Sequence, residues 1–185
     1  MTSKACSTAF PYLKPLLSND ESEVLELHDG NEPVLLDLSN GLLVAYLIDD
    51  DDRFLYVQKR DLIDAGLSGA ELHALALENL GEHARSKMQV EAYGNVYRVL
   101  LEGNFEASLI LLPELWDRDL ARLLPHGGVA ALPARDVLAF CDSESREGLA
   151  ELRKVVDRVS HVGDHLLSEH LYQRSADGTW TRRDS

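Results

Sequence analysis

The chain has few cysteines, no long apolar run and no recognisable leader. Each of these features argues against one class of protein: disulfide-rich, membrane-spanning or secreted. Cys6 and Cys141 are its only cysteines, too few for a disulfide framework, so we expect both thiols to be reduced. No apolar run approaches the roughly 18 residues of a membrane-spanning helix. Residues 1–10 lack the basic and then apolar pattern of a secretory signal. Together these features predict a cytoplasmic protein that binds no membrane.

Positive charge is also scarce. Lysine and arginine total 18 against 32 aspartate and glutamate residues, which gives a net charge of −14. Nucleic-acid binding relies on clustered cations that neutralise phosphates, so this balance predicts that the chain binds no nucleic acid. The same charge suits a basic protein partner, although solubility alone often accounts for an acidic surface. The sequence indicates no particular oligomeric state.

The common motifs that bind nucleotides or activate a serine are missing. Neither the G-x-x-x-x-G-K-S/T phosphate loop nor the G-x-G-x-x-G dinucleotide fingerprint is present. The G-x-S-x-G elbow of serine hydrolases is missing as well. These absences exclude the common nucleotide-dependent enzymes, and we expect no cofactor.

Four short turn signals are present instead, each flanked by apolar residues. Positive backbone φ suits Gly and Asn, and two-residue loops of this kind join antiparallel strands. The four pairs are Asn40-Gly41, Gly94-Asn95, Gly103-Asn104 and Asp177-Gly178. They predict hairpins, and therefore antiparallel rather than parallel sheets.

Apolar patterns between the turns predict groups of strands separated by single helices. Strands are expected at 34–38, 42–48, 54–57, 88–93, 96–101, 105–112, 129–132, 137–140, 171–174 and 179–182. Helices are expected from residue 68, at 113–124 and at 144–161. Glu71 follows Ser68 by three residues, which is the capping-box spacing of a helix start. The order predicts an α+β fold with antiparallel sheets built from hairpins and meanders and packed by about three helices.

The domain organisation follows from composition. Residues 1–32 form an acidic lead-in with little periodicity, and residues 33–185 read as a single α+β domain. Within that domain, two small lobes that meet near 113–125 are the alternative.

Five segments together resemble a known family. They are LLVAYLID (42–49), GLSGAELHALALENL (66–80), LPELW (112–116), VAALPARDVL (129–138) and LSEHLY (167–172). Their order over residues 34–182 resembles the YtpQ-like family of bacterial proteins of unknown function. The resemblance implies a bacterial, cytoplasmic α+β protein and transfers no catalytic or binding residues.

Two groups of residues are candidates for catalysis by a hydrolase. His161, His165 and His170, together with Asp164, form the densest set of potential metal ligands. Cys141 precedes a predicted helix N-terminus, which can activate a thiol, but the neighbouring acids oppose that activation. We predict no metal site and no catalytic residue, with the three histidines as weak metal candidates.

The candidates for binding are Arg135, Asp136, Asn79 and Trp116. Arg135 and Asp136 lie in the polar turn at 133–136, where a planar guanidinium can clamp a carboxylate or a partner loop. Asn79 borders the apolar stripe of the helix that starts near residue 68, and Trp116 can anchor an interface.

The leading functional hypothesis is a non-enzymatic, acidic protein-binding module, either an adaptor or an immunity-type inhibitor of a basic partner. One alternative is a hydrolase that uses the histidines or Cys141. The other is a small-ligand module in which Asn79 and Arg135 share a pocket.

Overall fold

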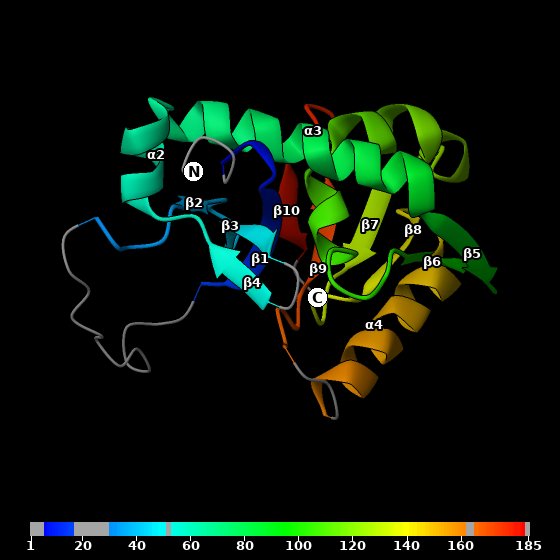
Figure 1. The fold of residues 1–185 in the computed structure, drawn as a ribbon. Coiled ribbons are helices and arrows are strands. Elements are labelled where there is room, and N and C mark those ends of the chain that lie inside the picture. The colour runs from blue at the N-terminus through cyan, green and yellow to red at the C-terminus, as the bar shows by residue number, and fades with distance from the viewer. Residues whose placement is uncertain (1–5, 17–29, 51–52, 162–164, 184–185) are drawn as a thin grey trace. The chain divides into compact units, whose positions relative to one another are not determined.

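The computed structural model describes residues 6–16, 30–50, 53–161 and 165–183. The chain divides into two compact units, Met1–His83 and Ala84–Ser185. Each unit contains one antiparallel sheet, so the predicted α+β class is confirmed (Figure 1). Each unit is described below by itself.

The first unit has a four-stranded sheet around the long strand β3 (Leu42–Asp50). On one side, β3 pairs with β1 (Phe10–Pro15). On its other side it pairs with β2 (Leu35–Asp37) and then with β4 (Arg53–Tyr56), which follow one another along the same edge. The apolar run of the sequence therefore forms the central strand, as the pattern predicts.

Two helices accompany this sheet. The short helix α2 (Lys59–Ala65) ends at Gly66, whose φ of 66° is the left-handed conformation of a helix C-terminus. The long helix α3 (Gly69–Lys87) follows the predicted capping box: the Ser68 amide donates to Glu71 Oε2 (2.8 Å), and the Glu71 amide donates to Ser68 Oγ (3.2 Å). The predicted apolar stripe of α3 is buried at Leu72, Ala76, Leu80 and Ala84.

The second unit has a six-stranded antiparallel sheet in the order β10-β9-β7-β8-β6-β5. Its strands are β5 (Gln89–Tyr93), β6 (Val96–Leu100), β7 (Gly128–Ala131), β8 (Leu138–Asp142), β9 (Leu171–Arg174) and β10 (Trp180–Arg183). Every residue of β7 is buried, because this central strand is covered on both faces.

Helix α4 (Arg146–Ser160) runs along one face of the six-stranded sheet (Figure 1). Ser145 caps its N-terminus by accepting a hydrogen bond from the Gly148 amide (3.1 Å). Leu152 and Val156 pack there in a core cluster with Cys141 and other side chains of the sheet. The predicted helix at 144–161 is therefore confirmed.

Three of the four predicted hairpins are confirmed. Gly41 and Gly94 have positive φ in the β2–β3 and β5–β6 connections, and Gly178 has positive φ between β9 and β10. The prediction at Gly103-Asn104 is wrong. There the buried Glu106 carboxylate accepts hydrogen bonds from the amides of Leu101 and Gly103 (2.7 Å each), which folds the chain into a turn with no following strand.

The predicted strand at 105–112 and the regular helix at 113–124 are also wrong. The first contains the 3-10 helix η1 (Ala107–Leu111), and the second contains the π turn η2 (Leu115–Asp119) and the 3-10 turn η3 (Ala121–Leu123). An apolar run this short fits a strand or a buried helical turn equally well. The indole of Trp116 donates to the Leu109 carbonyl (3.0 Å) and ties η1 to η2.

The domain boundaries expected from the sequence differ from the observed units. Part of the expected lead-in over 1–32 forms β1, which pairs with β3. The units divide at His83 rather than near 113–125. A compact unit need not fold independently, and therefore need not be a domain. The expected single domain over 33–185 thus stays a prediction.

Candidate functional site

The turn at 133–136 is held by its main chain. The Arg135 carbonyl accepts from the Ala107 amide (3.0 Å), and the Arg135 amide donates to the His165 carbonyl (3.3 Å). Arg135 is half-buried and Asp136 is exposed. The turn is therefore a fixed support for these two side chains, and their predicted role in binding stays a prediction.

Asn79 has a local structural task. Its side-chain amide donates to the carbonyls of Ser7 and Ala9, each at 2.9 Å. These bonds attach the segment before β1 to α3. Asn79 belongs to the first unit and Arg135 to the second, and the hypothesis that they share a pocket stays a prediction.

Trp116 packs in the core of the second unit. It is 3% exposed, and its ring meets Phe140 and Trp180 edge to face at centroid distances of 5.3 and 4.8 Å. Aromatic pairs of this geometry stabilise a core beyond their buried area. The ring therefore packs internally in this structure, and its predicted role as an interface anchor stays a prediction.

The three candidate histidines are all exposed. His161 places Nδ1 2.6 Å from the Asp157 carbonyl oxygen at the end of α4, and the His170 amide donates to Ser168 Oγ (3.1 Å). Within the described ranges, no three His, Cys, Asp or Glu side chains are grouped as metal ligands. Asp164, the fourth member of the predicted set, lies outside those ranges.

Cys141 is fully buried between β8 and α4. Burial is the main reason that the pKa of its thiol rises to about 11, and the charge of Asp142 raises it further. A nucleophilic cysteine must be a thiolate. At neutral pH this thiol stays protonated, so the structure gives no support to its use in the hydrolase alternative.

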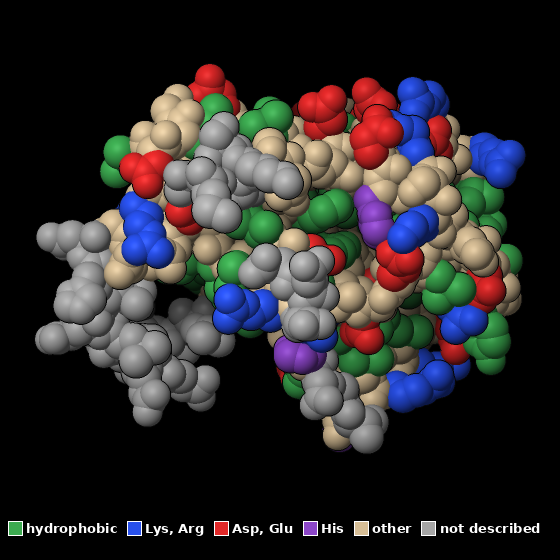
Figure 2. Space-filling model, viewed as in Figure 1, with side chains coloured by type: hydrophobic (Ala, Val, Ile, Leu, Met, Phe, Trp, Pro, Cys, Tyr) green, Lys and Arg blue, Asp and Glu red, His purple; other side chains and the backbone are tan. Residues whose placement is uncertain are grey.

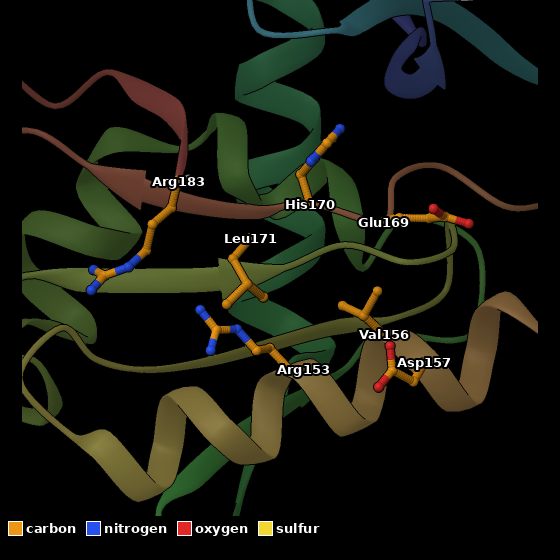
Figure 3. Close-up of a pocket in the computed structure, with 7 residues that line it drawn as sticks. All are labelled: Arg153, Val156, Asp157, Glu169, His170, Leu171 and Arg183. Atoms are coloured by element: carbon orange, nitrogen blue, oxygen red, sulfur yellow. The ribbon is translucent and has the colours of Figure 1, made fainter. Parts of the chain in front are cut away.

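The second unit contains a pocket of about 230 Å³ between α4 and the β9–β10 pair. Its floor is apolar, formed by Val156 of α4 and Leu171 of β9, both buried. Arg153, Asp157, Glu169, His170 and Arg183 complete the lining. Figure 3 shows both arginine side chains on one side of Leu171 and the two carboxylates on the other, while His170 turns away from α4. Of all the residues that the sequence singled out, His170 alone lines this pocket.

The first unit exposes an unusual group of side chains at the β2/β4 edge. Cross-strand pairs share one face of a sheet, and alternate β3 positions face the same way. The residues at positions 43, 45, 47 and 49 of β3 therefore share a face with their partners in β2 and β4. Five exposed side chains lie on this face: Asp49 of β3 and the four partners. We call them the edge surface: Leu35, Asp37, Asp49, Phe54 and Tyr56.

The edge surface combines apolar and acidic groups. Leu35, Phe54 and Tyr56 are 48%, 37% and 40% exposed, and both aspartates are exposed as well. Lys14 Nζ donates to the Tyr56 hydroxyl (3.0 Å) and orients that ring. On the opposite face of β3, the Tyr46 hydroxyl lies 3.0 Å from Nδ1 of His73 in α3. The sheet is thus covered by α3 on one face and carries the edge surface on the other.

Sequence reasoning missed both the pocket and the edge surface. Arg153 and Arg183 are 30 positions apart in sequence and line the same pocket only because α4 packs on the sheet. For the edge surface the sequence offers only a weak signal. Leu35 and Leu36 are consecutive and point to opposite faces of the sheet, so both are buried only where both faces are covered.

No helix within the described ranges has the length and apolar character that crossing a bilayer requires. Comparisons of the chain with protein-family models, with curated proteins and with solved structures found no match, so the resemblance to the YtpQ-like family stays an expectation from the sequence.

Proposed function

We propose that this protein is a non-enzymatic binding module that holds a basic protein partner on its edge surface. The observation that carries the proposal is the grouping of Leu35, Phe54 and Tyr56, all exposed, with two carboxylates on one face. Isolated exposed apolar residues are ordinary, but contiguous patches rimmed by polar groups mark interaction sites. Aromatic residues are also enriched where proteins bind one another.

Charge supports a basic partner. The net charge is −14, and Asp37 and Asp49 lie within the edge surface itself. Helix α3 adds Glu71, Glu78 and Glu82, which share one side of the helix at a spacing of seven and four residues. Figure 2 shows acidic side chains along α3, with lysine and arginine gathered near its C-terminal end. Such a field speeds association with a basic protein at low salt.

Affinity capture from cells that make the protein tests the proposal. The immobilised full chain is compared with the double variant Phe54→Ser/Tyr56→Ser at low and at high salt, and retained proteins are quantified by mass spectrometry. We expect the wild-type chain to retain one basic partner in near-stoichiometric amount. Retention should fall at high salt, because screening weakens exposed charges, and should fall at least tenfold in the double variant.

Ile63→Ser is the matched control, since Ile63 is 77% exposed in the same unit but lies on α2. It should retain the partner as the wild-type chain does. Equal retention by the double variant, or a partner lost equally in the control, would contradict the proposal.

We also infer a cytoplasmic location. Cys6 and Cys141 are both free thiols and both buried. A reducing compartment suits two unpaired cysteines.

A further inference from the structure

We propose that the pocket between α4 and the β9–β10 pair binds a small aliphatic zwitterion, with a carboxylate at one end and an ammonium group at the other. This site belongs to the second unit and is independent of the edge surface. The proposal rests on where β10 and α4 place two arginines, on the donors that these arginines keep for a ligand and on the opposite charge of the two ends of the pocket.

The sheet register places Arg183 beside the pocket floor. Arg183 of β10 lies directly opposite Leu171 of β9, so both side chains project from the face on which α4 packs. Helix α4 contacts β6, β7 and β8, and β10 is the edge strand. The uncovered end of this face is therefore where the hollow of about 230 Å³ lies.

Helix α4 supplies the second arginine. Arg153 and Val156 are three residues apart and share a side of the helix. Val156 closes the apolar floor against Leu171, and the Arg153 guanidinium lies on the same side of Leu171 as that of Arg183 (Figure 3). Two planar guanidinium groups beside one apolar floor are well suited to hold a carboxylate by paired hydrogen bonds.

The guanidinium groups keep donors for a ligand. Arg183 Nη1 donates to Gln173 Oε1 (2.8 Å), which fixes the orientation of this side chain and leaves its other N–H groups. Arg153 makes no hydrogen bond or ion pair with any residue in the described ranges. Its neighbour on the same helix, Lys154, is by contrast paired with Glu151 (3.0 Å). Among the described residues Arg153 is thus a cation without an ionic partner, beside an apolar surface on an acidic protein.

The other end of the pocket has the opposite charge. The carboxylates of Asp157 and Glu169 lie across Leu171 from the arginines (Figure 3). They disfavour a second anionic group and favour an ammonium group, while the apolar floor suits the methylene chain between the two charges. Pockets for drug-sized ligands span roughly 300–1,000 Å³. The smaller volume here fits a small molecule of the size of an amino acid.

Titration of the full ¹⁵N-labelled chain, followed by NMR, tests the site. The probes are 4-aminobutyrate and 6-aminohexanoate, with hexanoate, hexylamine and inorganic phosphate for comparison. We expect at least one aminoalkanoate to shift resonances of residues 153–157 and 169–171 and to bind at least fivefold more tightly than hexanoate. Hexylamine and phosphate should bind more weakly still.

Charge variants then identify the two ends. Arg153→Gln should weaken aminoalkanoate binding about tenfold, because it removes charge-assisted hydrogen bonds to the carboxylate of the ligand. Asp157→Asn should weaken the aminoalkanoate and leave hexanoate unchanged. Arg158→Gln is the matched control, because Arg158 is exposed on the same helix and does not line the pocket.

The spectrum of each variant reports its folding directly, so a loss of structure is distinguished from a loss of binding. Phosphate or hexanoate binding as tightly as the aminoalkanoates would overturn the proposal. Equal effects of Arg153→Gln and Arg158→Gln, or no shifts around the pocket with any probe, would overturn it too.

Discussion

The two sheets of this protein bury their strands to very different extents. In the second unit all four residues of β7 are buried, because α4 covers one face and Phe140 meets the ring of Trp116 on the other. In the first unit all residues of β2 and β4 are exposed. Exposed apolar strand residues do little for folding and attract other chains. Buried strands thus stabilise the second sheet, and the exposed apolar strands of the first support the proposal that it contacts a partner.

The largest expected effect tests the core of the second unit. Leu152 is fully buried under α4, so Leu152→Ala should lower the free energy of unfolding by about 2–5 kcal/mol through lost burial and a cavity. Denaturant unfolding followed by tryptophan fluorescence measures this, since both tryptophans belong to the second unit. Phe54→Ala of the edge surface should leave this transition unchanged. A smaller loss for Leu152→Ala than for Phe54→Ala would break the comparison.

A smaller effect is expected at Gly148, where α4 lies close against the sheet. A Cβ atom there would lie 2.8 Å from the Asn95 carbonyl oxygen, from Cys141 Cβ and from Ser145 Oγ. Gly148→Ala should therefore destabilise the unit by about 1–3 kcal/mol through overpacking.

The control is Gly69→Ala at the start of α3, where a Cβ atom meets nothing within 4 Å. It should leave stability unchanged or raise it, because alanine favours a helix. Calorimetry of both variants measures the difference. A stabilising Gly148→Ala would show that α4 and the sheet are less tightly packed than described.

The smallest effect concerns the first unit and pH. Burial lowers the pKa of His73 from its ordinary value of 6.5, while the unfolded chain keeps that value. The contribution of His73 to stability is therefore fully present above pH 6.5 and declines as the pH falls from 6.5 through the lower folded pKa. Amide hydrogen exchange of β3 across this range should show the decline.

His73→Gln should flatten that pH dependence, because it removes the titrating group beside Tyr46. His165→Gln, a change of an exposed histidine in the second unit, should leave the β3 profile as it is. A wild-type profile that does not change between pH 6.5 and 5, or one that His73→Gln leaves in place, would contradict the effect of burial on this ring.

Local signals in the sequence predicted much of the fold. The turns at Gly41 and Gly94 and the capping box at Ser68 depend on neighbouring residues alone, and all three are confirmed. Strand β1 went unpredicted because it contains Pro11 and Pro15, which argue against a strand. Only long-range pairing with β3 places it in the sheet, at an edge position where proline is tolerated.

The functional surfaces were less predictable. The pocket is lined by residues of α4, β9 and β10. Arg153 and Arg183 are too far apart in the sequence for any local motif to predict that they line the same pocket. His170 was singled out as a metal candidate and instead lines this pocket. Side chains that line one pocket across a tertiary contact leave no local pattern in the sequence, whereas caps and turns do.

Photo-crosslinking in the cells that make the protein tests the central claim, that the edge surface of the first unit binds a protein partner. A photoreactive phenylalanine derivative is placed at Phe54 and, as a control, at Ile63 of α2. The account predicts one crosslinked basic protein from position 54 that is absent from position 63. The same crosslinks from both positions, or none from position 54, would contradict it.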